Sequence, residues 1–189
     1  MADRRFSSDG LVMFAAGVVA GMVAGRLLPP VVAQAAGAAR AAAGRDPFEG
    51  LIADHRIFVS LLSKMENTPP DAVFQRTQLF LRLKRRLGAH ALAEEDVIYP
   101  LLHDEAKAAE DARHLYHEHA DMKMHLYALE QLPKNDPQWV GRVRALKALI
   151  EEHARQEEEV DFPKVRKALD ERRTKRMAGD LQREKALLL

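Results

Sequence analysis

The sequence of 189 residues contains no cysteine and few aromatic side chains. Without cysteine the chain has no disulfide, no thiolate zinc site and no thiol nucleophile, so any metal must be held by nitrogen and oxygen ligands. Aromatic residues make up 6% of the chain, and alternating valine-rich runs are missing over most of its length. Both features disfavour sandwiches, barrels and parallel sheets. The abundance of Leu, Ala, Lys, Arg and Glu favours a mostly helical protein instead.

The net charge is only +1, but the charges are segregated along the chain. Residues 46–163 carry 22 acidic and 15 basic side chains, a net charge of −7, whereas residues 1–45 carry +3 and residues 164–189 carry +5. The acidic middle has no nucleic-acid motif and no basic surface with interspersed aromatic residues. We therefore expect no nucleic-acid partner for it.

Residues 10–28, GLVMFAAGVVAGMVAGRLL, contain a single charge, Arg26, near their end. A stretch of about 20 apolar residues is long enough to cross a bilayer. Gly17, Gly21 and Gly25 recur every four residues, which lets two membrane helices approach closely. The sequence predicts a membrane helix at residues 10–28 and a homodimer formed through this glycine face.

Two alternatives for this N-terminal region, residues 1–45, remain open. One is a signal peptide cleaved after Ala33-Gln34-Ala35, which would export the protein to the periplasm, and the other is a soluble Ala/Gly-rich leader. If the segment is an anchor, three arginines follow its core and two precede it, so the positive-inside rule favours a cytoplasmic location for the domain.

Proline and acidic residues divide the rest of the chain into four predicted helices. Asp46 is expected to cap the first, with Glu49 completing a capping box, and Pro100 and Pro163 are expected to end the second and the fourth. The predicted ranges are 46 to about 67, 71–99, 105–132 and 136–162. The predicted fold is all-α, an antiparallel up-down-up-down four-helix bundle over residues 46–163, preceded by the hydrophobic helix and followed by a basic helix or tail at 164–189.

An internal duplication runs through this bundle. The segment from His90 to Pro100 aligns without gaps to the segment from His153 to Pro163, with six identities at an offset of 63 residues. Asp54-His55 matches Glu118-His119 at an offset of 64. Two helical hairpins are therefore copies of one unit.

The duplicated positions carry side chains that bind metals. Histidine and glutamate four residues apart lie one turn apart on the same face of a helix, so each copy can direct both toward one site. Imidazole and carboxylate donors suit iron or manganese, and the carboxylates can bridge a metal pair. The predicted ligands are His55, His90, Glu94, His119, His153 and Glu157.

Four acidic residues next to these ligands have two open interpretations. Asp54, Glu95, Glu118 and Glu158 either accept hydrogen bonds from the ligands or are solvated charges. Without metal, Glu94 and Glu157 are expected to raise each other's pKa and to take up protons.

A histidine or a glutamate run considered alone is more often a surface group or a satisfied core group than a ligand. The joint pattern in two copies favours a metal site, because facing carboxylates repel each other without a cation. The remaining histidines have no partner in the other copy and are expected at the surface: His103, His114, His117 and His125.

With these motifs, the chain resembles the hemerythrin-like, or HHE cation-binding, family over about residues 47–163. The resemblance implies an antiparallel four-helix bundle with a non-heme di-iron centre that binds O₂ or nitric oxide, or responds to redox or iron status. Oxygen-carrying members have a second histidine one turn after the ligand on the third helix, where this chain has Lys123. This departure favours sensing, iron-handling or stress roles over oxygen transport.

Three functional hypotheses follow. The first is a di-iron protein, tethered to a membrane, that binds or senses O₂, nitric oxide, redox or iron status without catalysis. The second is a di-iron enzyme of oxidative or nitrosative stress, with ferroxidase, peroxidase-like or iron-repair activity. The third is a structural membrane-anchored bundle with a degenerate site.

Overall fold

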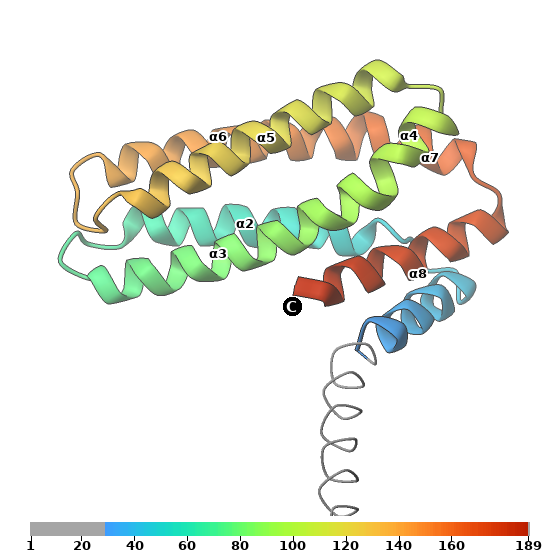
Figure 1. The fold of residues 1–189 in the computed structure, drawn as a ribbon, viewed down its shortest axis with the longest axis horizontal. Helices are drawn as coiled ribbons and strands as arrows, with labels where there is room; N and C mark the ends of the chain where they lie inside the picture. Colours follow the sequence, from blue (N-terminus) through green and yellow to red (C-terminus); the bar gives the residue numbers. More distant parts are fainter. Residues whose placement is uncertain (1–28, 189) are drawn as a thin grey trace, which may run out of the picture.

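The computed structural model describes residues 29–188, and these residues form helices joined by short connections (Figure 1). Within this range no helix has the length and apolar character needed to cross a bilayer. The predicted membrane helix at residues 10–28, with Gly17, Gly21 and Gly25, lies outside the described residues. It therefore stays a prediction.

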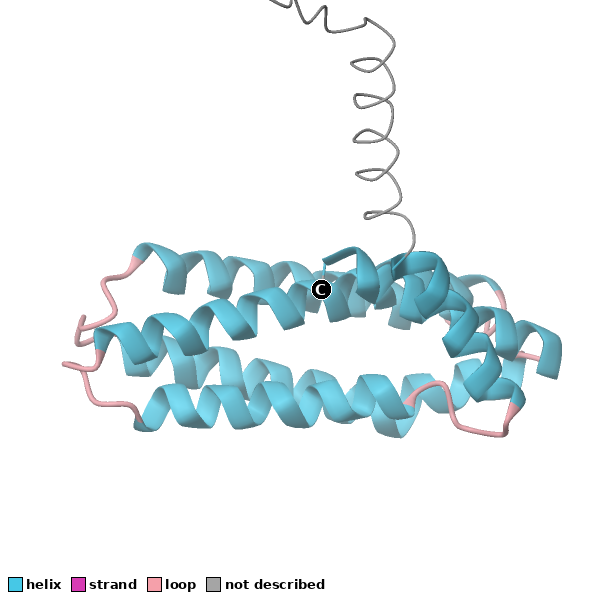
Figure 2. Cartoon of the chain, turned by 90° about the horizontal axis from the view of Figure 1, so that it is seen from below, coloured by secondary structure: helices cyan, strands magenta, loops and turns pink. Residues whose placement is uncertain are grey.

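Four long helices lie side by side (Figures 1 and 2), which confirms the predicted all-helical bundle. Helix α2 packs against α3 and α6, and α5 packs against α6. In Figure 1 the α2–α3 and α5–α6 connections lie at one end of the molecule, and the α4–α5 connection lies at the other. The four helices are α2 (Glu49–Asn67), α3 (Val73–Ala93), α5 (Ala109–Gln131) and α6 (Trp139–Gln156).

Two apolar clusters fill the interior of the bundle, one at each end. Helical spacing brings Phe58, Leu62 and Met65 of α2 to one face, and they pack in the cluster that contains Trp139. The other cluster contains Leu51, Tyr99 and Phe162. Along α2, His55 therefore lies between the two clusters, and the corresponding positions on α3, α5 and α6 follow the same order. This arrangement places the buried histidines and glutamates of the bundle helices in one polar layer between the apolar clusters.

Pro100 and Pro163 do not end their helices, so the predicted ends at Tyr99 and Phe162 are wrong. Each proline follows one wide π-helical turn, η1 (Glu94–Ile98) or η2 (Glu157–Asp161), and the helix continues as α4 (Tyr99–Asp104) or α7 (Phe162–Ala168). A π turn bonds each N–H to the carbonyl five residues back, which gives a proline ring more room than an α-helical turn. The Tyr99 N–H accordingly donates to the Glu94 carbonyl.

The predicted capping of the first helix by Asp46 is also wrong. Helix α2 begins at Glu49 after Phe48, and no side chain caps it. The Asp46 carboxylate instead accepts the Phe48 N–H at 3.1 Å and pairs with Arg166. A carboxylate two residues before an N–H commonly forms such a turn, which competes with capping.

Residues 29–42 are helical, and Figure 1 shows this helix beside α8 (Glu171–Leu188). The two helices cross closely at glycine: a Cβ added to Gly37 would lie 2.2 Å from the carbonyl oxygen of Ala178. The Gln34 side-chain amide donates to Asp180 at 2.8 Å. Helix α8 in turn packs on α3 and η1, so it links residues 29–42 to the bundle.

Candidate metal centre

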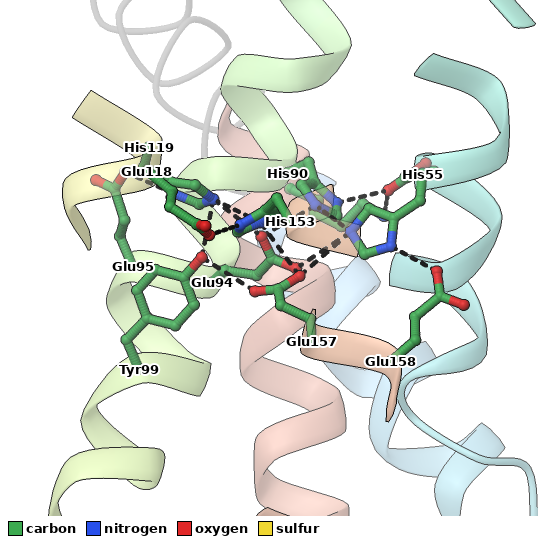
Figure 3. Close-up of polar contacts among 12 residues, drawn as sticks. His55, His90, Glu94, Glu95, Tyr99, Glu118, His119, His153, Glu157 and Glu158 are labelled. Carbon is green, nitrogen blue, oxygen red and sulfur yellow. Dashed lines mark hydrogen bonds and ion pairs between the residues drawn. The ribbon is translucent and has the colours of Figure 1, made fainter. Parts of the chain in front are cut away.

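All six predicted ligands converge in the polar layer between the apolar clusters (Figure 3). Each of the six side chains is at most 3% exposed. They form two groups that could each hold a metal ion, one of His55, His90, Glu94 and Glu157 and one of Glu94, His119 and His153. Glu94 belongs to both groups.

Local helix geometry positions the carboxylates. Each glutamate follows its histidine by four residues and is the first residue of a π turn. Because π turns are rare and frequently lie at functional sites, their occurrence at equivalent positions in both copies marks the duplicated unit structurally as well as in sequence.

The inward-facing atoms are close enough to share bound cations. The Nε2 atoms of His55 and His90 are 3.1 Å apart, and those of His119 and His153 are 3.3 Å apart. Glu94 Oε2 lies 3.0 Å from His90 Nε2 and 3.5 Å from His119 Nε2. Each carboxylate contacts histidines of both groups, as Glu157 Oε2 also lies 3.3 Å from Nε2 of His55 and of His153.

The four acidic neighbours lie on the outer side of the histidines, and three of them orient a ring. The Nδ1 atom of His55 bonds to Glu158 at 2.8 Å, that of His119 to Glu95 at 2.9 Å, and that of His153 to Glu118 at 2.7 Å. A carboxylate that accepts Nδ1–H leaves the Nε2 lone pair of a neutral ring for a metal. Asp54 faces His90 Nδ1 at a longer distance, 3.5 Å.

Buried carboxylate oxygens without a hydrogen-bond donor favour a bound cation at this site. Among the described residues, both carboxylate oxygens of Glu94 and Oε2 of Glu157 are buried without a hydrogen-bond donor. Buried carboxylates of this kind are costly unless a donor or a cation compensates them. Four imidazoles and two carboxylates, with three rings already oriented by acceptors, match the donor set that iron uses in helical bundles.

The expectation that Glu94 and Glu157 raise each other's pKa is wrong in its net result. Burial raises the pKa of both carboxyl groups, and Glu157 also raises that of Glu94, but the facing histidines outweigh these effects and hold each pKa below its ordinary value. The proton resides on the rings instead. Burial lowers the pKa of His153, but Glu157 and Glu118 raise it to about 10.

Tyr99 is a site residue that the sequence interpretation did not single out. Its side chain is fully buried, and its hydroxyl donates to Glu157 Oε1 at 3.0 Å and lies 2.8 Å from His119 Nε2. Burial, Glu157 and Glu94 raise the pKa of this phenol well above its ordinary value, so the hydroxyl keeps its proton. One indication of its role was present in the sequence: the equivalent position of the other copy is Phe162, so only the first copy has a hydroxyl there.

Lys123 lies at the edge of the site and is not part of either group. Its side chain is 58% exposed and binds Glu95 at 2.6 Å, the same carboxylate that holds His119. Of the four histidines expected at the surface, three are exposed and His125 is half-buried. None of them belongs to the two candidate groups found among residues 29–188.

A small cavity of about 160 Å³ reaches the site between α3 and α5. His119, Glu95 and Lys123 line one part of it, and the rest of its lining is apolar, including Met122 and Leu188. A cavity of this size and character admits a small apolar molecule.

Residues 46–165 match the profile of the hemerythrin HHE cation-binding domain. The chain belongs to this family. The matched segment contains all six predicted ligands and both π turns, and it ends before α8. The hemerythrin-like domain therefore comprises the bundle, whereas residues 29–42 and α8 lie outside it.

Two curated relatives are similar to this chain. A DNA nickase of Nostoc sp. is 29% identical over 133 residues, which cover 70% of this chain and 37% of that protein. An uncharacterized hemerythrin-like protein of Schizosaccharomyces pombe is 31% identical over 103 residues, which cover 52% of this chain and 50% of that protein. The chain thus spans half or less of the length of these relatives. No solved structure matches the chain significantly.

Proposed function

We propose that this protein holds two non-heme irons within an antiparallel, up-down-up-down arrangement of α2, α3, α5 and α6. The observation that carries the proposal is Glu94, which belongs to both buried ligand groups and so suits a carboxylate that bridges two metals. Manganese is the alternative metal, because it accepts the same oxygen and nitrogen donors. The proposed ligands are the six residues named from the sequence.

The proposed role is to bind or sense O₂ or nitric oxide, or to report redox or iron status. The apolar cavity beside His119 supports a small uncharged ligand. Iron would supply the electrons and the open coordination position for such a ligand, whereas the chain orients the rings through Glu95, Glu118 and Glu158 and excludes water with the two apolar clusters. The ammonium of Lys123 has no lone pair to offer a metal, which favours sensing over reversible oxygen carriage.

Metal analysis after anaerobic reconstitution with ferrous iron tests the centre itself. We expect about two irons per folded chain, as in other paired-carboxylate bundles. The double variant Glu94→Ala/Glu157→Ala should lose them, and Glu110→Ala/Glu152→Ala, which removes two exposed carboxylates, should keep them. Folded wild-type protein without metal would leave the third hypothesis, a degenerate structural bundle.

Mixing the ferrous protein with O₂ or nitric oxide tests the ligand. We expect a ligand-dependent change in the optical spectrum, with iron oxidation by O₂ that is not reversed under vacuum. Full recovery of the ferrous spectrum under vacuum would favour oxygen carriage and contradict the argument from Lys123.

A di-iron enzyme is the second candidate, and the Tyr99 hydroxyl favours it. This buried donor lies beside the ligands, where a phenol can position or supply a proton to a bound molecule. Multiple turnovers of peroxide, nitric oxide or ferrous iron per chain would support the enzyme. Tyr99→Phe should then reduce the turnover rate, whereas Tyr127→Phe, on the exposed face of α5, should not.

The relative from Nostoc sp. is named for nicking DNA, and this activity needs its own test in the present chain. We expect no conversion of supercoiled plasmid to the open circle, because the bundle is acidic and the chain covers only 37% of that relative. Metal-dependent nicking that Glu94→Ala/Glu157→Ala abolishes would overturn this expectation.

The proposed location is a membrane, through residues 10–28, with dimerisation through Gly17, Gly21 and Gly25 and the domain on the cytoplasmic side. Carbonate extraction of membranes and the intact mass of native protein distinguish this arrangement from a signal cleaved after Ala35 and export to the periplasm. A full-length chain in the soluble fraction would contradict both.

A further inference from the structure

Lys185 of helix α8 lies outside the matched hemerythrin-like domain, yet it pairs with Asp54 at the edge of the polar layer. Its side chain is only 14% exposed, and its ammonium bonds to Oδ2 of Asp54, which immediately precedes His55 on α2. The same Asp54 oxygen faces Nδ1 of His90. One carboxylate oxygen therefore lies beside both a lysine and a candidate metal ligand.

His90 differs from the other three histidines of the site in this respect. The other Nδ1 atoms have carboxylate acceptors at 2.7–2.9 Å, whereas the His90–Asp54 distance is 3.5 Å. Within the part of the chain that the structure describes, His90 Nδ1 is buried without a hydrogen-bond partner. The internal duplication makes the contrast direct, because Glu118, the counterpart of Asp54, bonds to His153 at 2.7 Å.

The bond to Lys185 accounts for this contrast. The carboxylate of Asp54 bonds to the ammonium of Lys185, and this charge-assisted bond holds the shared oxygen toward the lysine. An imidazole without an outer acceptor is less firmly oriented and is a less basic ligand.

We propose that Lys185 is a positioning residue that withholds Asp54 from His90 and thereby weakens metal binding in the group of His55, His90, Glu94 and Glu157. The proposal rests on the metal centre proposed above. Helix α8 thus lowers the metal affinity of one half of a duplicated site, and the other half keeps its oriented histidines. His90 and Lys185 compete for one carboxylate.

Anaerobic titration with Co²⁺, a spectroscopic probe for nitrogen and oxygen sites, tests the proposal on the full chain. We expect Lys185→Met to tighten the weaker of two Co²⁺ equilibria by about tenfold, the smaller end of the effect of changing an outer partner of a ligand. Lys185→Arg should behave as wild type because it keeps the bond to Asp54. Lys175→Met is the matched control, since Lys175 on the same helix pairs with the exposed Glu171.

The exchangeable imidazole protons provide a readout that a purely structural role would not change. In the Co²⁺ protein we expect three slowly exchanging, paramagnetically shifted N–H resonances for wild type and a fourth for Lys185→Met, when Asp54 becomes free to accept from His90. When Asp54 is already replaced in Asp54→Asn, the additional change Lys185→Met should alter neither the Co²⁺ affinity nor the number of slowly exchanging N–H resonances. This comparison also covers the case in which Lys185→Met alone folds poorly.

The outcomes separate this inference from the proposed centre. No Co²⁺ and no iron in folded wild-type protein would overturn the centre. Two Co²⁺ ions in wild type, with unchanged affinity and three slow resonances in folded Lys185→Met, would overturn only the role of Lys185.

Discussion

At the scale of single residues, the site is a set of paired charges in which buried carboxylates face protonated rings. The histidines lower the pKa of Glu94 and of Glu157, and the carboxylates in turn raise the pKa of three of these rings. The three rings are those that also bond to Glu158, Glu95 and Glu118, namely His55, His119 and His153. Each side chain therefore stabilises the charge of another. Removing one group leaves a buried partner without compensation.

Tyr99 illustrates this dependence. The change Tyr99→Phe keeps the ring and its packing but removes the hydroxyl that donates to Glu157 Oε1. A buried acceptor without its donor costs about 1–3 kcal/mol, so the free energy of unfolding of metal-free protein should fall by this amount. Urea denaturation measures it, with Tyr127→Phe on the surface as the control. No loss in Tyr99→Phe would show that the hydroxyl contributes nothing to stability.

The pKa of His153 predicts how the stability of metal-free protein depends on pH. The folded value of about 10 lies above the ordinary value of 6.5, because Glu157 and Glu118 outweigh the effect of burial. The stabilisation from this proton is complete below about pH 6.5 and is lost as the pH rises through about 10. Denaturation between pH 6 and pH 10 should therefore show falling stability. His153→Leu should flatten this slope and His103→Leu, an exposed site, should not; equal slopes in all three proteins would contradict the assignment.

At the scale of elements, two π turns and one close helix crossing decide where the functional groups lie. Each π turn lets a helix pass its proline and sets the direction of a glutamate and of the aromatic residue that follows it. At Gly37, residues 29–42 pack against helix α8. Helix α8 also contains Lys185, which pairs with Asp54. The bundle is thereby connected to helices outside the family domain.

The crossing at Gly37 can be tested with one methyl group. Gly37→Ala would place a Cβ 2.2 Å from the Ala178 carbonyl oxygen, a distance that forces the two helices apart. We expect limited proteolysis to cleave the connection between residues 42 and 49 at least several-fold faster, with iron content unchanged. Gly141→Ala in α6 is the control because its Cβ would meet no atom within 4 Å. Unchanged cleavage of Gly37→Ala would show that this contact does not hold the helix.

At the scale of the whole molecule, the polar layer divides the core of the bundle. The two apolar clusters stabilise the ends of the bundle, whereas the layer between them buries charges that oppose folding unless they are compensated. A cation that binds only the folded state should stabilise the molecule by mass action.

Thermal unfolding with and without ferrous iron measures this coupling. At an iron concentration about 100 times the dissociation constant, binding adds about 2.7 kcal/mol, which should raise the Tm of wild type by roughly 5 °C or more. Glu94→Ala/Glu157→Ala should show little shift, and Glu110→Ala/Glu152→Ala should shift like wild type. Equal shifts in all three proteins would mean that iron binds elsewhere.

Much of the site was predictable from the sequence because duplication and helical spacing are properties of the chain itself. Histidine and glutamate four residues apart share a helix face in any α-helix, and their recurrence in a second copy indicated which histidines belong together. The same reasoning separated these four from His103, His114, His117 and His125. The all-helical fold followed from composition, and its division into four helices followed from proline and acidic residues.

Only the tertiary structure decided the details that depend on neighbours distant in sequence. The continuation of the helices past Pro100 and Pro163 requires π turns, and proline in a sequence ordinarily indicates a helix end. The pKa order at the site depends on four histidines from four helices, so the rings take the protons that the sequence had assigned to the carboxylates. Likewise, Lys185 meets Asp54 across 131 residues of sequence, because only the packing of α8 on the bundle brings the two charges together.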